Sequence, residues 1–153
     1  MMKKAVLMLT LTILLCAGAA HAQDKGFGIG IILGEPTGIS AKKWIGSHSA
    51  IDAAVAWSFG QGGSFHLHAD YLHHNFNLFD VESGRLPLYF GIGIRFRTDP
   101  DTTLGARFPV GICYIFEKAP LDIFLEIGPV LDLIPGMSFE FTGSIGARFY
   151  FKK

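Results

Sequence analysis

The chain has 153 residues, of which half are hydrophobic and 17% are charged, and its 13 Lys and Arg residues equal its 13 Asp and Glu residues in number. Balanced charge without a basic block argues against a nucleic-acid partner, because phosphate binding needs clustered Lys and Arg. A composition this hydrophobic also excludes a disordered chain, and the length suits a single domain of about 100 to 150 residues.

The first 22 residues have the layout of a secretory signal peptide. Two lysines precede a hydrophobic run over residues 5–16, and Ala20-His21-Ala22 places small residues where signal peptidase cleaves. This run is shorter than the roughly 20 residues that a membrane-spanning helix needs. We therefore expect cleavage after Ala22, which leaves residues 23–153 as one mature domain.

Beyond the signal segment, hydrophobic and polar residues alternate with the period of a β-strand. In the last segment Phe141 and Phe149 fall on one face, and Glu140 and Arg148 fall on the other. Clusters of Gly, Pro, Ser and Asp separate such segments, so about eight strands are expected. We place them near Phe27–Leu33, Ile39–Ile45, Ala50–Phe59, Phe65–Asn75, Leu86–Arg97, Thr103–Phe116, Leu121–Leu133 and Phe139–Phe151.

Two prolines, Pro109 and Pro129, fall inside predicted strands. Because proline has no N–H to donate to the strand ladder, a bulge or a local break is expected at each. Several strand segments nevertheless approach the roughly 9 to 11 residues that a tilted strand needs to cross a bilayer.

The composition of the two faces predicts the type of barrel. One face collects the charged residues together with many glycines, and the opposite face is almost free of charge. A membrane barrel turns its hydrophobic face to lipid, whereas a soluble barrel buries it. The large Phe, Ile and Leu side chains would crowd a small interior, so we predict an all-β, up-and-down antiparallel barrel with the charged face inside. The predicted lumen charge network consists of Lys42, Asp52, His66, His68, Asp70, Arg95, Arg97, Arg107, Asp122, Glu126, Glu140 and Arg148.

Aromatic residues near the predicted strand ends are consistent with girdles at two lipid interfaces. These residues are Trp44, Trp57, Tyr71, Tyr89, Tyr114 and Tyr150. The glycines on the charged face, in contrast, are expected to make room for side-chain packing in the lumen.

One strand carries residues that suit metal coordination. His66, His68 and Asp70 occupy alternate positions, so two imidazoles could chelate one ion, with Asp52 as a candidate ligand from a neighbouring strand. Alternatively, these side chains form hydrogen bonds and ion pairs inside the lumen, for example with Lys42 or an arginine such as Arg95 or Arg97. We expect the second arrangement and predict no metal ion or cofactor.

The spacing of the second half resembles a known group of proteins. It contains Arg107, Pro109, Gly111, Tyr114 and Phe116, then the run 120–126, then Pro129, Leu131, Leu133-Ile134-Pro135, Gly143, Ile145-Gly146, Arg148 and Tyr150-Phe151; the resemblance extends to segments 34–38 and 66–71. Together these features resemble an uncharacterised family of small bacterial outer-membrane β-barrels of the OmpA and OmpX type. The resemblance implies eight antiparallel strands, a periplasmic amino terminus and an outer-membrane location, and it implies no activity. The segment Gly146 to Phe151 also resembles the carboxyl-terminal signal that the barrel assembly machinery reads.

A lumen filled with charged side chains would obstruct solutes, so we predict a structural or interaction role without an open pore. The expected partners are outer-membrane lipid and the assembly machinery, and the expected state is a monomer. One alternative is a soluble periplasmic lipocalin-like barrel that binds an apolar ligand, which requires the opposite orientation of every strand. A second alternative is a lipid-modifying outer-membrane enzyme. The His-x-Ser-Asn motif of the deacylase type is absent from the sequence, and we predict no catalytic residues.

Overall fold

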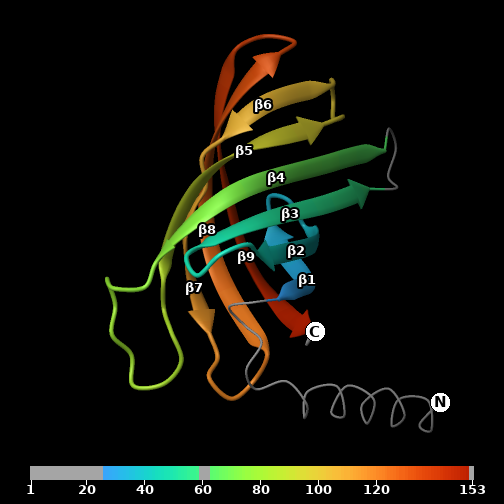
Figure 1. Cartoon of the computed structure of the whole chain (residues 1–153). Helices are drawn as coiled ribbons and strands as arrows, with labels where there is room; N and C mark the ends of the chain where they lie inside the picture. Colours follow the sequence, from blue (N-terminus) through green and yellow to red (C-terminus); the bar gives the residue numbers. More distant parts are fainter. Residues whose placement is uncertain (1–25, 59–62, 152–153) are drawn as a thin grey trace, which may run out of the picture.

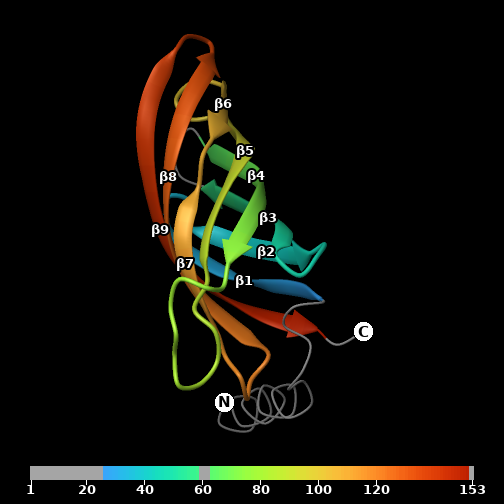
Figure 2. The ribbon, with the colours of Figure 1, turned by 60° about the vertical axis from the view of Figure 1, so that its left-hand side comes forward.

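The computed structural model describes residues 26–58 and 63–151, which form a curved antiparallel sheet (Figures 1 and 2). The predicted signal peptide and its cleavage site lie outside the described residues. In these two ranges no helix is long and hydrophobic enough to cross a membrane. The strands are β1 (Phe27–Gly34), β2 (Gly38–Trp44), β3 (Ser49–Ser58), β4 (Ser64–Asn75), β5 (Leu88–Arg97), β6 (Thr103–Arg107), β7 (Val110–Ile115), β8 (Leu121–Ile134) and β9 (Ser138–Phe151).

The sheet closes into a ring. Neighbours in sequence pair antiparallel from β1 to β5, β8 pairs with β9, and β9 pairs with β1. Both β6 and β7 lie between β5 and β8, so together they fill one place in the ring. The predicted up-and-down barrel of eight strands is therefore confirmed, with strand bounds close to those expected from the alternation.

Pro109 interrupts the strand that contains β6 and β7. Arg107 faces Gly93 of β5 before the interruption, and Val110 faces Phe90 after it, so the pairing register is the same on both sides. The ladder is interrupted because Pro109 has no N–H to donate, and the strand continues along β5 in the same direction after it. The register shift in this strand lies elsewhere, between Leu104 and Gly105, where β6 pairs with β8.

Pro129 produces no break, and the expectation of one is wrong. Strand β8 runs through it, and Pro129 faces Phe141 of β9. Opposite the other edge of β8, the Phe108 N–H donates to the Pro129 carbonyl at 2.9 Å. The pair lacks only the second hydrogen bond, which a residue with an N–H at position 129 would donate to Phe108. Because Pro129 lies beside the gap that Pro109 already makes, one interruption of the ladder accommodates both prolines.

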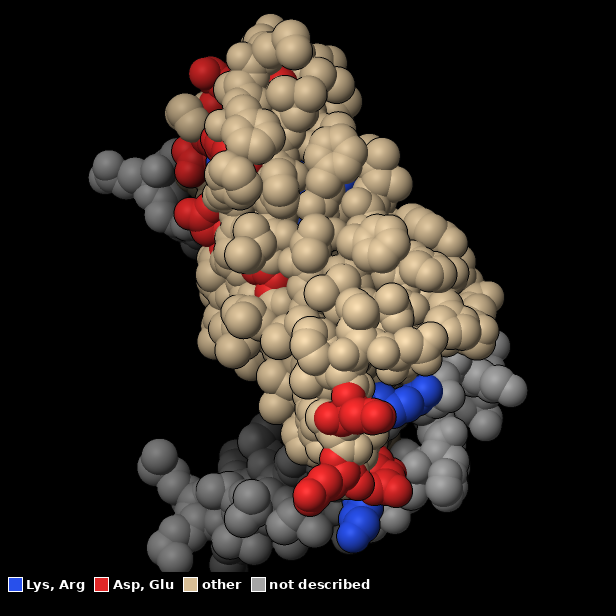
Figure 3. All heavy atoms as spheres, turned by 90° about the vertical axis from the view of Figure 1, so that its left-hand side faces the viewer, with Lys and Arg blue, Asp and Glu red and all other residues tan. Residues whose placement is uncertain are grey.

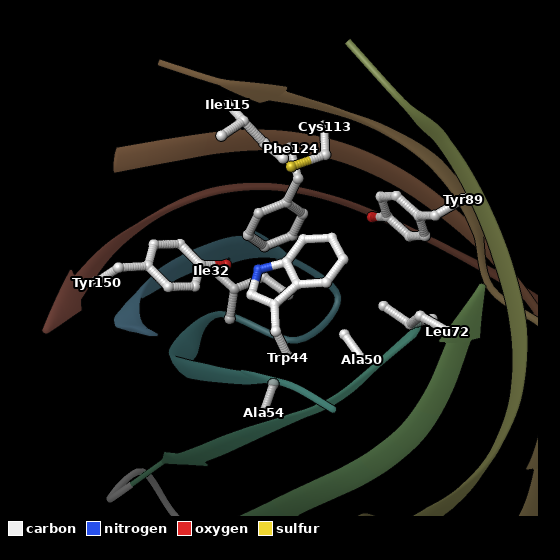
Figure 4. Packing of buried hydrophobic residues seen from close by; sticks show 10 residues of the cluster. All are labelled: Ile32, Trp44, Ala50, Ala54, Leu72, Tyr89, Cys113, Ile115, Phe124 and Tyr150. Atoms are coloured by element: carbon white, nitrogen blue, oxygen red, sulfur yellow. The ribbon is translucent and has the colours of Figure 1, made fainter. Parts of the chain in front are cut away.

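The end of the barrel that holds the carboxyl terminus is filled by buried hydrophobic side chains (Figures 1 and 4). Trp44, Tyr89 and Tyr150 belong to this cluster and are buried, so their expected place in lipid-facing girdles is wrong. Each stands at an inward position of its strand, and this alternation determines where its ring lies. Trp57 and Tyr71 do face outward.

The outer surface of the barrel is hydrophobic. Outward positions carry large apolar side chains that stay exposed, such as Ile94 at 63% and Phe141 at 66%. Figure 3 shows one side of the barrel, where charged side chains gather at the lower end and along the upper left edge, and uncharged residues cover most of the face between them. This orientation of the two faces is the reverse of the one that a lipocalin-like barrel requires.

Candidate functional site

The structure places the predicted charge network inside the ring. Lys42, Asp52, His68, Asp70, Arg95, Arg107, Asp122, Glu126 and Arg148 are buried, and His66, Arg97 and Glu140 are half-buried. Removing so many charges from water is costly unless each is paired and hydrogen-bonded. The contacts between these groups therefore determine what the interior can do.

Arg107 of β6 organises the middle of the lumen. Its Nε donates to Asp70 Oδ2 at 2.9 Å, its Nη2 contacts Glu126 Oε1, and its Nη1 donates to Thr142 Oγ1 at 3.1 Å. Glu126 in turn accepts a hydrogen bond of 2.8 Å from the Tyr89 hydroxyl. One guanidinium thus joins residues of β4, β8 and β9.

A second group lies nearer the end that holds the carboxyl terminus. Arg148 of β9 donates from Nε to Asp122 at 3.0 Å and from Nη1 to Asp52 at 3.4 Å, and its guanidinium lies over the Phe124 ring at 4.1 Å. Asp122 also accepts a hydrogen bond of 2.6 Å from the Tyr150 hydroxyl. In this group Arg148 supplies the positive charge and aromatic rings exclude water around it.

Lys42 of β2 extends this group toward β4. Its Nζ lies 4.0 Å from an Asp122 carboxylate oxygen and 2.8 Å from His74 Nε2. The ammonium group also lies 4.5 Å from the centre of the Trp44 ring. A buried lysine therefore has a carboxylate, an imidazole and an aromatic face as partners.

A third group lies at the opposite mouth of the barrel. Arg95 of β5 donates to Asp132 at 2.5 Å and to Glu140 at 2.9 Å, and Arg97 donates to Glu140 at 3.2 Å. These arginines line a cavity of about 430 Å³ together with His66 and the turn between β1 and β2. The mouth is therefore open as a shallow cavity, with buried ion pairs beneath it.

Several of these polar contacts cross three strands, with a glycine on the strand between the partners. Asp70 of β4 faces Gly93 of β5, which faces Arg107 of β6. In the same way Gly111 separates the bonded pair Tyr89 and Glu126. Arg95, Gly105 and Asp132 form the third such set.

These glycines are needed because the polar atoms occupy the space where a side chain would start. A Cβ added to Gly93 would overlap Asp70 Oδ1, and one added to Gly105 would come 2.5 Å from Asp132 Oδ1. A Cβ on Gly111 would meet the Tyr89 hydroxyl at 2.5 Å. The glycines therefore leave a path along which side chains two strands apart can meet.

Sequence reasoning missed several members of the network. Asp132 lies in the predicted strand and has the same alternation as Asp122 and Glu126, so its place on the charged face could have been read from the sequence. The signal was weakened by the turn that follows at Pro135. His74, for which no inward place was predicted, is buried beside Lys42.

The candidate metal ligands are brought together only in part. His68 Nε2 lies 3.7 Å from Asp70 Oδ2, and Asp52 faces Asp70 across β3 and β4. His66 lies toward the mouth, with its Nε2 3.4 Å from His68 Nδ1. The partner of Asp70 is Arg107, and not Lys42, Arg95 or Arg97 as the sequence suggested, because pairing across Gly93 could not be foreseen without the register.

We predict that Gly93→Ala lowers the free energy of unfolding by about 1–3 kcal/mol, the usual cost of overpacking. The added methyl group would overlap Asp70 Oδ1 and the Ala69 carbonyl oxygen. Urea-induced unfolding of the folded barrel, followed by tryptophan fluorescence, measures the change. Gly143→Ala is the matched control, because a Cβ there meets no atom within 4 Å. Equal stability of the two variants would contradict the role assigned to Gly93.

Glu126→Ala should be more damaging, by about 3–5 kcal/mol, because it leaves the buried Arg107 with one carboxylate fewer. Glu126→Gln keeps an acceptor for Arg107 and Tyr89 and should lose less. Glu82→Ala removes an exposed carboxylate and serves as the control. The same unfolding assay compares the three variants, and a midpoint for Glu126→Ala equal to that of the control would show that Arg107 does not depend on this contact.

Comparison with known proteins supports the fold. No protein-family model matches the sequence, and no curated protein matches it. Among solved structures, the chain is similar to the N-terminal β-barrel domain of Pseudomonas aeruginosa OprF, with a TM-score of 0.63 and 13% sequence identity. The similarity covers 84% of this chain and 98% of the OprF domain. At this identity the match establishes a shared fold, the eight-stranded antiparallel barrel.

Proposed function

We propose that this chain is an integral outer-membrane β-barrel with a structural or interaction role and no open pore. The observation that carries the proposal is the arrangement of its two faces, with exposed hydrophobic side chains around the outside and paired charges inside. Lipid is the solvent that suits such an outer surface, because water would have to hydrate it at high cost. The shared fold with the OprF outer-membrane barrel supports the same location.

Closure of the lumen follows from two layers. Buried ion pairs around Arg107 and Arg148 occupy the middle of the barrel. Toward the end that holds the carboxyl terminus, the hydrophobic cluster that includes Trp44 and Phe124 packs against the charged groups of Lys42 and Arg148 (Figure 4). An ion that entered from the mouth would have to displace bonded charges and pass the hydrophobic side chains packed against them.

The same proposal includes the partners. The outer surface is in contact with outer-membrane lipid, the chain acts as a monomer, and the segment Gly146 to Phe151 of β9 is read by the barrel assembly machinery. We also infer that the barrel is not an enzyme, because the sequence lacks the His-x-Ser-Asn motif of the deacylase type, and Ser58, Ser64 and Ser144 have no His and acid at a diagnostic spacing. The lipocalin-like alternative receives no support from the positions of the side chains, since the charged face and not the hydrophobic face is buried.

Cell fractionation tests the location. We expect the expressed full-length chain in the outer membrane, resistant to carbonate extraction, with an electrophoretic mobility that changes on boiling because the barrel stays folded in detergent. Recovery in the soluble periplasm without a heat shift would refute the proposal.

Cysteine reactivity tests the orientation of the faces in lipid vesicles. In a Cys113→Ala background, Ile92→Cys should react with a membrane-soluble maleimide, because Ile92 is exposed on the outer face. Ser144→Cys should not react, because Ser144 is buried in the lumen. The reverse pattern would show that the faces are inverted.

Planar-bilayer recordings test closure. The purified barrel should show no steady conductance at moderate voltage, because bonded charges and aromatic rings fill the path. Stable, ohmic conductance steps from the wild-type chain would contradict a closed lumen.

A further inference from the structure

Two carboxylates oppose one another in the lumen. Asp52 of β3 faces Asp70 of β4 directly in the pairing register, and both side chains are buried. Directly opposed residues on one face have Cβ atoms about 4.5–5.5 Å apart, and like charges at such positions repel. The sheet register therefore holds two acidic side chains next to each other inside the barrel.

The arginines nearby neutralise these carboxylates only in part. Arg107 binds Asp70 Oδ2 at 2.9 Å, and Arg148 binds Asp52 Oδ2 at 3.4 Å. The other oxygen of each carboxylate, Oδ1, is buried and has no hydrogen-bond partner. A buried carboxylate oxygen without a donor is costly, so each side chain can still bind a cation.

His68 completes a set of three possible ligands. The ligand atoms of Asp52, His68 and Asp70 all lie within 4.8 Å of one another. In the tautomer in which His68 Nδ1 donates to His66 Nε2, 3.4 Å away, the lone pair of His68 Nε2 is on the side of Asp70. A hydrogen bond to the second ring nitrogen is the usual way in which a metal-binding imidazole is oriented.

The charge of the surrounding network favours a cation at this place. Four carboxylates and three cationic side chains are connected by ion pairs: Asp52, Asp70, Asp122 and Glu126, with Lys42, Arg107 and Arg148. With all four carboxyl groups ionised, as in a metal-bound state, this network has one negative charge in excess. A Zn²⁺ ion with a hydroxide as its fourth ligand adds one positive charge and makes the network neutral.

We propose that the lumen binds one divalent transition-metal ion, best matched by Zn²⁺, through Asp52, His68 and Asp70. One imidazole and two carboxylates with an open fourth position suit zinc, whereas calcium requires six to eight oxygen ligands. His66 borders the cavity at the mouth, directly before His68, and so marks the route of entry. The ion pairs of Asp70 with Arg107 and of Asp52 with Arg148 each use one carboxylate oxygen, Oδ2, so the second oxygen of each carboxylate is left for the metal ion.

Zinc titration of the folded full-length chain in detergent, after chelator treatment, tests the site by calorimetry. We expect one Zn²⁺ per chain in the wild type and at least a tenfold weaker affinity in His68→Gln, which keeps a neutral polar side chain. The control is His73→Gln, which removes an exposed imidazole that stacks on His48 with ring centres 6.2 Å apart. This outer pair is the competing place for adventitious zinc, and the control should bind like the wild type.

Two results would overturn the proposal: no zinc binding to the wild type, or binding that His73→Gln abolishes and His68→Gln leaves unchanged. If His68→Gln does not fold, as judged by its heat-shifted mobility, cobalt loading of the wild type decides. Four- or five-coordinate Co²⁺ in the lumen gives strong visible absorption, which supports the site. The weak bands of six-coordinate Co²⁺ would count against it.

Discussion

The interior of this barrel depends on polar side chains that meet across an intervening strand. Neighbouring strands lie about 4.8 Å apart, so partners two strands away are separated by roughly twice that distance. Arg107 and Asp70 can cover it only because the residue between them is Gly93. The same arrangement joins Tyr89 to Glu126 over Gly111. Without these glycines, buried charges would lie inside the ring without partners, at a cost of several kcal/mol each.

Polar and hydrophobic side chains are distributed unevenly along the axis of the barrel. At the mouth, Arg95 and Arg97 share Glu140 beside a cavity, and both water and ions can enter there. Deeper in the lumen, Arg107 and Arg148 are bonded on several sides, and the Phe124 ring lies against the Arg148 guanidinium. At the far end hydrophobic side chains pack against one another (Figure 4). Ion pairs therefore occur along the whole lumen, and those of Arg107 and Arg148 are better shielded from water than the Arg97–Glu140 pair at the mouth.

Much of this organisation could be predicted from alternation, because a strand places every second residue on the same face. The number of strands, their bounds and the inward place of most charged residues all follow from it. The pairing of charges could not be predicted, because it depends on the register between strands. Asp70 and Arg107 are 37 residues apart and meet only when both face Gly93. The effect of Pro129 could not be predicted for the same reason. A proline disrupts a strand only where its nitrogen stands at a position that would donate to the neighbouring strand, and this depends on the register.

Asp52 and Asp70 are the exception within this network. Arg107 and Asp70 approach from strands two apart, where Gly93 leaves room for opposite charges to meet, and Arg148 directly faces an opposite charge, Asp122, on the adjacent strand. Asp52 and Asp70, in contrast, are two acidic groups that face each other on adjacent strands. Arg107 reaches Asp70 over Gly93, and Arg148 reaches Asp52 from β9, so each acid is neutralised from a different side of the ring. One oxygen of each carboxyl group, Oδ1, still has no hydrogen-bond partner. Binding of a cation between these two carboxylates would remove the repulsion that the register imposes when both are ionised.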